Sequence, residues 1–143
     1  TDFIFGPSTA LFENCEIRSK TNSYVTAAST PEDIAVGYVF KNCKLTANPG
    51  VDKVYLGRPW RPYAATVFIN CEMGKHIRPE GWHNWGKEEN EKTARYAEYN
   101  STGEGAAAAG RVKWAKQLTK KEAAQYDDLN YIYRMCSDWK PEN

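Results

Sequence analysis

The stretch Ala65-Thr-Val-Phe-Ile-Asn-Cys-Glu-Met73 is one of three copies of a single pattern, Phe-x-Asn-Cys-x-apolar. The other two copies are Thr9-Ala-Leu-Phe-Glu-Asn-Cys-Glu-Ile17 and Gly37-Tyr-Val-Phe-Lys-Asn-Cys-Lys-Leu45. Their phenylalanines follow one another at intervals of 28 residues, at Phe12, Phe40 and Phe68. A fixed period between about 20 and 50 residues is typical of repeat architectures. The pattern therefore predicts stacked copies of one structural unit.

Each copy has the composition of a β-strand. The runs are short, are bounded by Gly, Pro or Asn, and are rich in Val, Thr, Tyr and Phe. Residues 23–28 and 53–57 have the same character, so each repeat should supply two or more strands. A parallel β-solenoid, in which each coil pairs with the next, is the architecture that stacks such units. We therefore expect an all-β fold.

Recurrence of the same inward position in every coil predicts ladders of like side chains. The phenylalanines should stack, and the asparagines should form an amide ladder at a turn, at Asn14, Asn42 and Asn70. Buried cysteine commonly behaves as a small hydrophobe. We therefore expect a buried ladder of free thiols at Cys15, Cys43 and Cys71. The alternative is that Cys15 pairs with a cysteine upstream of this sequence.

Length, charge and residue spacing exclude several classes of function. The 143 residues are enough for one domain, which we expect to span 1–143. Charge is nearly balanced, with 19 Lys and Arg against 18 Asp and Glu, so we expect no nucleic-acid partner and no membrane partner. No apolar run approaches the length of a membrane span. The cysteines and histidines lack zinc-ligand spacing, and we predict no metal site.

The period is lost after Met73, so the coils should occupy residues 1–73. Residues 74–92 should form a long functional loop, in which Trp82 and Trp85 either line a cleft or pin the loop. In the same loop, His76 and His83 should lie at the surface. A last strand and a tail should follow at 93–117, with a flexible segment at 101–110.

The C-terminal part, residues 118–143, should hold a helix and a polar tail. Thr119 is a predicted N-cap, and Glu122 stands three residues later, as in a capping box. The helix should run from Lys120 to about Tyr131. It would cover an open edge or a side of the solenoid.

The segments around Asp2 and Arg58 are predicted to form half of an active site. Asp2 adjoins the apolar run Phe3-Ile4-Phe5, and a buried unpaired carboxylate is costly. Arg58 lies in Tyr55-Leu-Gly-Arg-Pro-Trp60, and a guanidinium beside the ring of Trp60 suits a carboxylate and a sugar face. We therefore expect Asp2 and Arg58 to lie side by side. A structural ion pair without a catalytic role is the alternative.

These motifs resemble the C-terminal half of the pectin methylesterases (pectinesterases). The resemblance covers nearly the whole chain in the family's order, and the shared segments include Asp2-Phe-Ile-Phe-Gly6, Gly37-Tyr-Val-Phe-x-Asn-Cys43, Tyr55-Leu-Gly-Arg-Pro-Trp60, Gly81-Trp82 and Glu98-Tyr-Asn-Ser-Thr-Gly103. It implies a right-handed parallel β-helix. It also implies a secreted protein, extracellular or periplasmic, that needs no cofactor.

The resemblance implies hydrolysis of the methyl esters of homogalacturonan (pectin), with release of methanol. Asp2 takes the place of the nucleophile, and Arg58 that of the residue that orients it. Trp60 and Phe5 match positions that contact the sugar chain. The family's general acid/base Asp and oxyanion Gln lie upstream of the nucleophile and are absent here. We therefore expect a C-terminal fragment, inactive without the missing N-terminal half of the domain.

Two rival functions remain open. A polysaccharide lyase on the same architecture would need an Asp cluster for calcium, whereas the acids around Asp2 and Arg58 are scattered. A non-enzymatic solenoid, such as an adhesin or a carbohydrate-binding module, would not need an acid facing Arg58. Methanol release from methylated pectin, compared with activity in the absence of methyl esters, separates the three.

Overall fold

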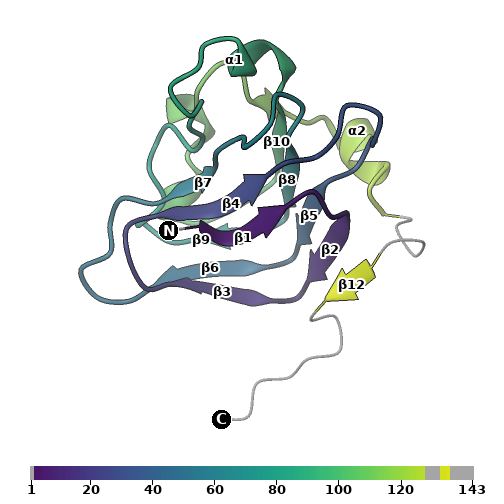
Figure 1. Ribbon diagram of the computed structural model, residues 1–143. Helices are drawn as coiled ribbons and strands as arrows, with labels where there is room; N and C mark the ends of the chain where they lie inside the picture. The colour runs from purple at the N-terminus through teal and green to yellow at the C-terminus, as the bar shows by residue number, and fades with distance from the viewer. Residues whose placement is uncertain (1, 128–132, 136–143) are drawn as a thin grey trace.

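The computed structural model describes residues 2–127 and 133–135 and consists mainly of parallel strands in three sheets. The chain passes from one sheet to the next and returns to the first, as the strand order in Figure 1 shows. Every strand pair is parallel and joins strands of different coils. The parallel β-solenoid predicted from the repeat is confirmed.

The first sheet has the order β1-β4-β7 and carries the candidate site. Its strands are β1 (Asp2–Gly6), β4 (Tyr24–Ala28) and β7 (Tyr55–Gly57). Single bridges from Val54 to Ile77 and from Gly57 to Trp82 extend this sheet into the next coil. The strands expected at 23–28 and 53–57 are confirmed, but the region expected to be a loop continues the coil at these two bridges.

The second and third sheets complete the solenoid. The second has six strands in the order β11-β10-β8-β5-β2-β12. Their bounds are β2 (Ala10–Glu13), β5 (Tyr38–Lys41), β8 (Ala65–Ile69), β10 (Arg95–Tyr99), β11 (Lys116–Gln117) and β12 (Tyr133–Met135). The third sheet contains β3 (Glu16–Ser19), β6 (Lys44–Ala47) and β9 (Glu72–Met73). The strand β12, which pairs with β2, was not predicted.

The asparagine of each repeat forms the corner between the second and third sheets. These residues have positive φ, at 59° for Asn14, 55° for Asn42 and 53° for Asn70, a region that asparagine enters more readily than most residues. Asn100 adds a fourth corner with φ 50°, and its Nδ2 donates to Asn70 Oδ1 at 2.9 Å. The predicted asparagines therefore lie at a turn, and an amide bond between neighbouring corners is seen for Asn70 and Asn100.

The phenylalanine stack is confirmed. The rings of Phe12 and Phe40 are 4.8 Å apart and those of Phe40 and Phe68 are 4.5 Å apart, both nearly parallel. Offset or stacked aromatic pairs add stability beyond their buried area. The three rings form the centre of the core between the sheets.

The cysteine prediction is right for two residues and wrong for one. Cys43 and Cys71 are free and buried, and the Cys43 contact together with burial raises the pKa of the Cys71 thiol. Cys15 is disulfide-bonded. A disulfide at Cys15 was the alternative left open by the sequence, and burial alone could not decide between the two states.

The outer face of the six-stranded sheet is covered by the segment around α2 (Lys120–Ala124). Leu118 and Tyr126 pack against a second apolar cluster formed by Leu11, Val39, Val67, Ile69 and Ala97. The capping box of Thr119 and Glu122 is confirmed. The helix ends earlier than expected, and residues 128–131 of the predicted helix lie outside the described residues, as do those of the expected polar tail.

The segment expected to be flexible at 101–110 contains two turns of 3-10 helix, η1 (Glu104–Ala106) and η2 (Ala108–Gly110). Gly103 and Gly105 pack so closely against β9 and Gly74 that a Cβ atom at either position would collide with a carbonyl oxygen. Composition suggested a linker, but these glycines serve close packing. Among the residues described, none of the helices has the length and apolar character that spanning a bilayer requires.

Candidate functional site

The first sheet brings the surroundings of Asp2 and Arg58 together. Asp2 is in register with Tyr24, and Tyr24 is in register with Tyr55. Arg58 follows β7, and its Cζ lies 4.2 Å from the centroid of the Tyr24 ring. The guanidinium therefore reaches the strand next to Asp2, although 56 positions separate the two residues in the sequence. The ion pair itself remains a prediction.

Close packing fixes the backbone that presents Arg58. A Cβ atom on Gly57 would collide with Thr26 Oγ1 and press on the Trp82 ring, so the position accepts only glycine without rearrangement. Thr26 Oγ1 donates to Leu56 O at 3.0 Å. The amides of Arg58 and Trp60 donate to the carbonyls of Thr26 and Ala28, at 3.1 and 2.9 Å. These contacts hold the Gly-Arg-Pro-Trp segment against β4.

An exposed aromatic surface, formed by Phe5, Trp60 and Trp85, adjoins Arg58. Phe5 is 62% exposed, and Trp60 and Trp85 are each 38% exposed. Their ring centroids are 5.3 Å apart for Phe5 and Trp60, and 5.9 Å apart for Trp60 and Trp85. Arg58 Cζ lies 4.5 Å from the Trp85 ring. Trp60 and Trp85 also line a hollow of about 230 Å³. Grouped exposed aromatic side chains commonly mark a binding site.

The turn that presents Trp85 is held by side chains. Trp85 has φ 58°, which is unusual for a bulky residue. Its amide donates to His83 Nδ1 at 3.0 Å, and the Gly86 amide donates to Asn84 Oδ1 at 2.8 Å. Asn84 in turn donates to Glu91 Oε2 at 2.8 Å. The sequence left two roles open for the tryptophans, lining a cleft or pinning the loop. Trp85 fits the first role, because it lies at the surface beside Arg58 and lines a hollow.

Trp82 pins the loop from inside the core. It is 1% exposed and stacks on Tyr96 at 4.2 Å. Its Nε1 donates to Glu98 Oε2 at 3.2 Å, and Glu98 also binds Arg111 through two contacts of 2.8 and 3.1 Å. The sequence prediction missed this buried ion pair. The repeat gave no signal for it, because the 28-residue period leads from Phe68 to Tyr96, whereas the structure pairs Phe68 with Glu98.

Arginines lie at both ends of a stacked pair of tyrosines, Tyr24 and Tyr55, whose centroids are 5.4 Å apart. Arg58 lies over Tyr24, and Arg78 Cζ lies 4.8 Å from the Tyr55 ring. His83 meets both rings edge-on, at 5.8 and 5.1 Å. Burial and the charges of Arg58 and Arg78 lower the pKa of His83, so its imidazole is neutral at pH 7. The positive charge of this face therefore comes from the arginines.

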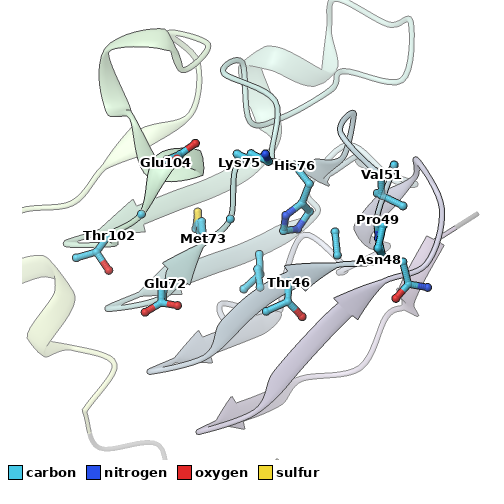
Figure 2. A pocket seen from close by; sticks show the side chains of 15 residues that line it. Thr46, Asn48, Pro49, Val51, Glu72, Met73, Lys75, His76, Thr102 and Glu104 are labelled. Carbon is cyan, nitrogen blue, oxygen red and sulfur yellow. The ribbon is translucent and has the colours of Figure 1, made fainter.

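His76, expected at the surface, is only 3% exposed. Its Nε2 has no hydrogen-bond partner among the described residues, and burial lowers its pKa. His76 lines a hollow of about 640 Å³ shown in Figure 2, with Thr46, Glu72 and Lys75 around it. This hollow lies beside β6 and β9, and no residue of the predicted site lines it.

Side chains that could ligate a metal are scattered over the part of the chain that the structure describes. There, no three side chains of His, Cys, Asp or Glu are grouped so that they could hold a metal ion. The side chains of the candidate site are of another kind. They offer a guanidinium, stacked phenols and an exposed aromatic surface.

Comparison with known proteins gives consistent matches. The Pectinesterase family model matches residues 1–135. Pectinesterase 31 of Arabidopsis thaliana is 43% identical over 132 residues, which cover 92% of this chain and 42% of the relative. The structure of carrot pectin methylesterase has a TM-score of 0.76 and 30% identity, and the match covers 84% of this chain and 42% of that one.

Two further solved structures resemble the chain. Pectin methylesterase PemA from Erwinia chrysanthemi matches with a TM-score of 0.74 and 31% identity, over 96% of this chain and 48% of that one. A pectin methylesterase in complex with a hexasaccharide matches with a TM-score of 0.76 and 31% identity, over 99% and 48%. The chain therefore spans less than half the length of each relative named here.

Proposed function

Because this chain belongs to the pectinesterase family, we propose that it contributes to an enzyme that hydrolyses the methyl esters of homogalacturonan and releases methanol. The observation that carries the proposal is the position of Arg58, whose guanidinium lies over Tyr24, the register neighbour of Asp2. The hexasaccharide complex of a related pectin methylesterase supports a saccharide substrate.

In this proposal Asp2 is the nucleophile. One of its carboxylate oxygens adds to the C6 carbonyl carbon of a methylated galacturonate and forms a tetrahedral intermediate. The intermediate collapses to an acyl-enzyme anhydride as the methoxy group takes up a proton and leaves as methanol. Water then attacks the anhydride and frees galacturonate and the Asp2 carboxylate. Arg58 favours the ionised form of Asp2 and orients it, because a guanidinium stabilises an adjacent carboxylate.

Two groups complete the chemistry. A general acid/base must protonate the leaving methoxide and later deprotonate water. An oxyanion donor must stabilise the tetrahedral intermediate, a contribution of about 3 kcal/mol in typical enzymes. By the family resemblance, an Asp acts as the general acid/base and a Gln as the oxyanion donor, both in a segment that precedes Asp2.

The aromatic surface holds the sugar chain. The flat rings of Phe5 and Trp60 offer faces on which the apolar side of a pyranose can pack, with Trp85 beside them. Arg58 lies on the Trp85 ring and therefore joins the binding surface to the proposed catalytic pair. Homogalacturonan is a cell-wall polymer, so we propose an extracellular or periplasmic location.

The test measures methanol release from methylated pectin by the longest form of the protein in which this chain occurs. Asp2→Ala should abolish release, and Arg58→Ala should reduce kcat by at least about 100-fold, the scale of a lost electrostatic contact at a reacting centre. Arg58→Lys, which keeps the charge without the planar fork, should recover only part of the activity. Arg18→Ala, on β3, is the matched control and should leave turnover unchanged.

Unchanged turnover in Asp2→Ala would show that the nucleophile lies elsewhere. Product analysis tests the rival functions at the same time. A lyase would give unsaturated products and would act on pectin without methyl esters, whereas a non-enzymatic solenoid would bind pectin without changing it. Trp60→Ala should raise KM with a smaller effect on kcat, because it removes binding surface and leaves the reacting groups in place.

A further inference from the structure

The corner between the second and third sheets has an asparagine with positive φ in each of four coils. Only the last of them, Asn100, begins the sequence Asn-Ser-Thr, with a hydroxyl side chain two residues later. Asn14, Asn42 and Asn70 are followed at the same distance by Glu, Lys and Glu. Asn-x-Ser/Thr is the acceptor sequence for N-linked glycans in secreted proteins, and the chain contains it nowhere else.

The structure holds this sequence at the surface with its two recognition side chains outward. Asn100 and Thr102 are exposed, whereas Ser101 between them is half-buried and its Oγ accepts from the Cys71 amide at 3.3 Å. The Thr102 amide donates to Cys71 O, and Thr102 O accepts from the Met73 amide, both at 2.8 Å. The backbone is therefore anchored to β9, while the side chains that a glycan transferase recognises remain accessible.

The hydrogen bond of Asn100 leaves room for a glycan. Its Nδ2 donates to Asn70 Oδ1 at 2.9 Å. A side-chain amide nitrogen carries two N–H groups, and a sugar replaces one of them. The remaining N–H can keep the contact with Asn70. The strand β11, which follows β10 in the second sheet, leads into α2, so no further corner of this kind follows Asn100 among the described residues.

The corner at Asn100 lies away from the candidate site. The chain runs through the first, second and third sheets in turn, so each coil has three corners. The corner between the second and third sheets is the one that does not adjoin the first sheet. Asp2 lies in the first sheet, and Arg58 directly follows a strand of it. A glycan on Asn100 therefore leaves the surface around these two residues open.

We propose that Asn100 is the attachment site of an N-linked glycan, added as the chain passes through a eukaryotic secretory pathway. Asn100 Nδ2 forms a bond to C1 of the first N-acetylglucosamine as the bond between C1 and the diphosphate of a lipid-linked donor breaks. The lipid diphosphate leaves, and the Nδ2 proton goes to a base of the transferase. The disulfide at Cys15 fits this route, because disulfides form in oxidising secretory compartments.

The first experiment identifies the modified residue. The longest form of the protein in which this chain occurs is secreted from a eukaryotic host and treated with peptide:N-glycosidase in heavy-oxygen water. This enzyme converts a glycosylated asparagine to a labelled aspartate. Trypsin then releases residues 96–111 as one peptide, in which Asn100 is the only asparagine. We expect the label in this peptide, and recovery of the peptide with an unmodified asparagine only would overturn the proposal.

Variants test whether the acceptor sequence is responsible. Thr102→Ala should lose the label and the glycan-dependent shift in gel mobility, because it removes the hydroxyl and leaves Asn100 in place. Thr102→Ser keeps a hydroxyl and should stay labelled. Asn70→Gln is the matched control, since it alters the partner amide at a corner without the acceptor sequence, and it should keep the glycan. Full labelling in Thr102→Ala would contradict the assignment.

A last comparison tests the position of the glycan. Wild type and Thr102→Ala from the same host should release methanol from methylated pectin at equal rates. A severalfold faster release by Thr102→Ala would contradict a position away from the candidate site. This comparison depends on the proposed function, whereas the peptide mass does not, so either proposal can fail without the other.

Discussion

Phe68 and Glu98 occupy the same register position in successive coils and both lie against Trp82, yet the chemistry of their other contacts differs. Phe68 continues a stack of rings that begins at Phe12. Glu98 is 4% exposed and binds Arg111 and the Trp82 indole. The comparison shows that the repeat determines which positions point inward, whereas the chemistry at each position can change. A charge at an inward position must be paired, and here the pair ties the following loop to the core.

Arg111 extends the ion pair into the loop. Its guanidinium donates to the carbonyls of Gly105 at 2.6 Å, Pro79 at 3.1 Å and Arg78 at 3.3 Å. The phenylalanine stack joins coil to coil, while Glu98 and Arg111 join three separate parts of the chain. We expect the first to govern the stability of the coils and the second to govern the position of the loop that carries Trp85.

The largest expected effect comes from breaking the ion pair. Arg111→Met should lower the free energy of unfolding by about 4 kcal/mol, because it leaves the Glu98 carboxylate buried without its cation. Urea denaturation measures the loss. The double variant Glu98→Gln with Arg111→Met should lose less than the sum of the single variants. Strict additivity would show that the two side chains act independently.

Shortening the aromatic stack should have a smaller effect. Phe40→Leu keeps an apolar side chain but removes two ring contacts, and it should cost about 2 kcal/mol. The matched control is Phe5→Leu, which lies at the surface and should change stability by less than about 0.5 kcal/mol. Equal losses in both variants would remove the distinction between stacked and exposed rings.

The buried histidine of the loop predicts a pH effect. Burial lowers the pKa of His76 below its ordinary value of 6.5. As pH falls below 6.5, the unfolded chain takes up a proton that the folded chain does not, so stability is complete above 6.5 and is lost toward the folded pKa. His76→Leu should therefore become more stable relative to the wild type between pH 7 and pH 5, by about 1.4 kcal/mol per unit of pKa depression.

Urea titrations of both proteins across this pH range isolate His76, because the other groups cancel in the difference. A difference that does not vary with pH would contradict the lowered pKa. His83→Asn, whose side-chain oxygen can still accept the Trp85 amide, is a useful second variant. It removes the other histidine whose pKa is lowered and leaves His76 in place.

The smallest effect should come from the N-cap of α2, which belongs neither to the phenylalanine stack nor to the Glu98–Arg111 ion pair. Thr119→Ala removes the acceptor of the Glu122 amide and should cost about 1 kcal/mol. Hydrogen exchange at the Glu122 amide should accelerate, while exchange in the phenylalanine-bearing strands should not. Lys120→Ala, at the first residue of the helix, is the control. Equal acceleration in the strands would show that the cap is coupled to the core.

The parts of the fold that were predictable are those that repeat or belong to a motif. The period placed the phenylalanines and the asparagine corners correctly, because every coil must bury the same position. Two short motifs placed Asp2 in one strand of the first sheet and Arg58 directly after another. The ion pair of Glu98 and Arg111 was not predictable from the repeat, since it occurs where the pattern changes and its cation follows a segment rich in Gly and Ala.

The remaining misses have related causes. The burial of His76 depends on close packing around Gly74, which local composition does not reveal. The strand β12 pairs with β2 across more than 100 residues of sequence, and a short C-terminal run gives no local sign of this partner.

The asparagine corner constrains how such a molecule can change. The strands on either side are separated by two residues in each of three coils, at 14–15, 42–43 and 70–71. The other connections differ in length and carry Arg58, Trp60 and Trp85. We therefore expect insertions and deletions to be tolerated in the connections that carry Arg58, Trp60 and Trp85. We expect none at the asparagine corners, where the two-residue length keeps the coils in register. The residues around the candidate site can therefore change during evolution without a change in how the coils stack.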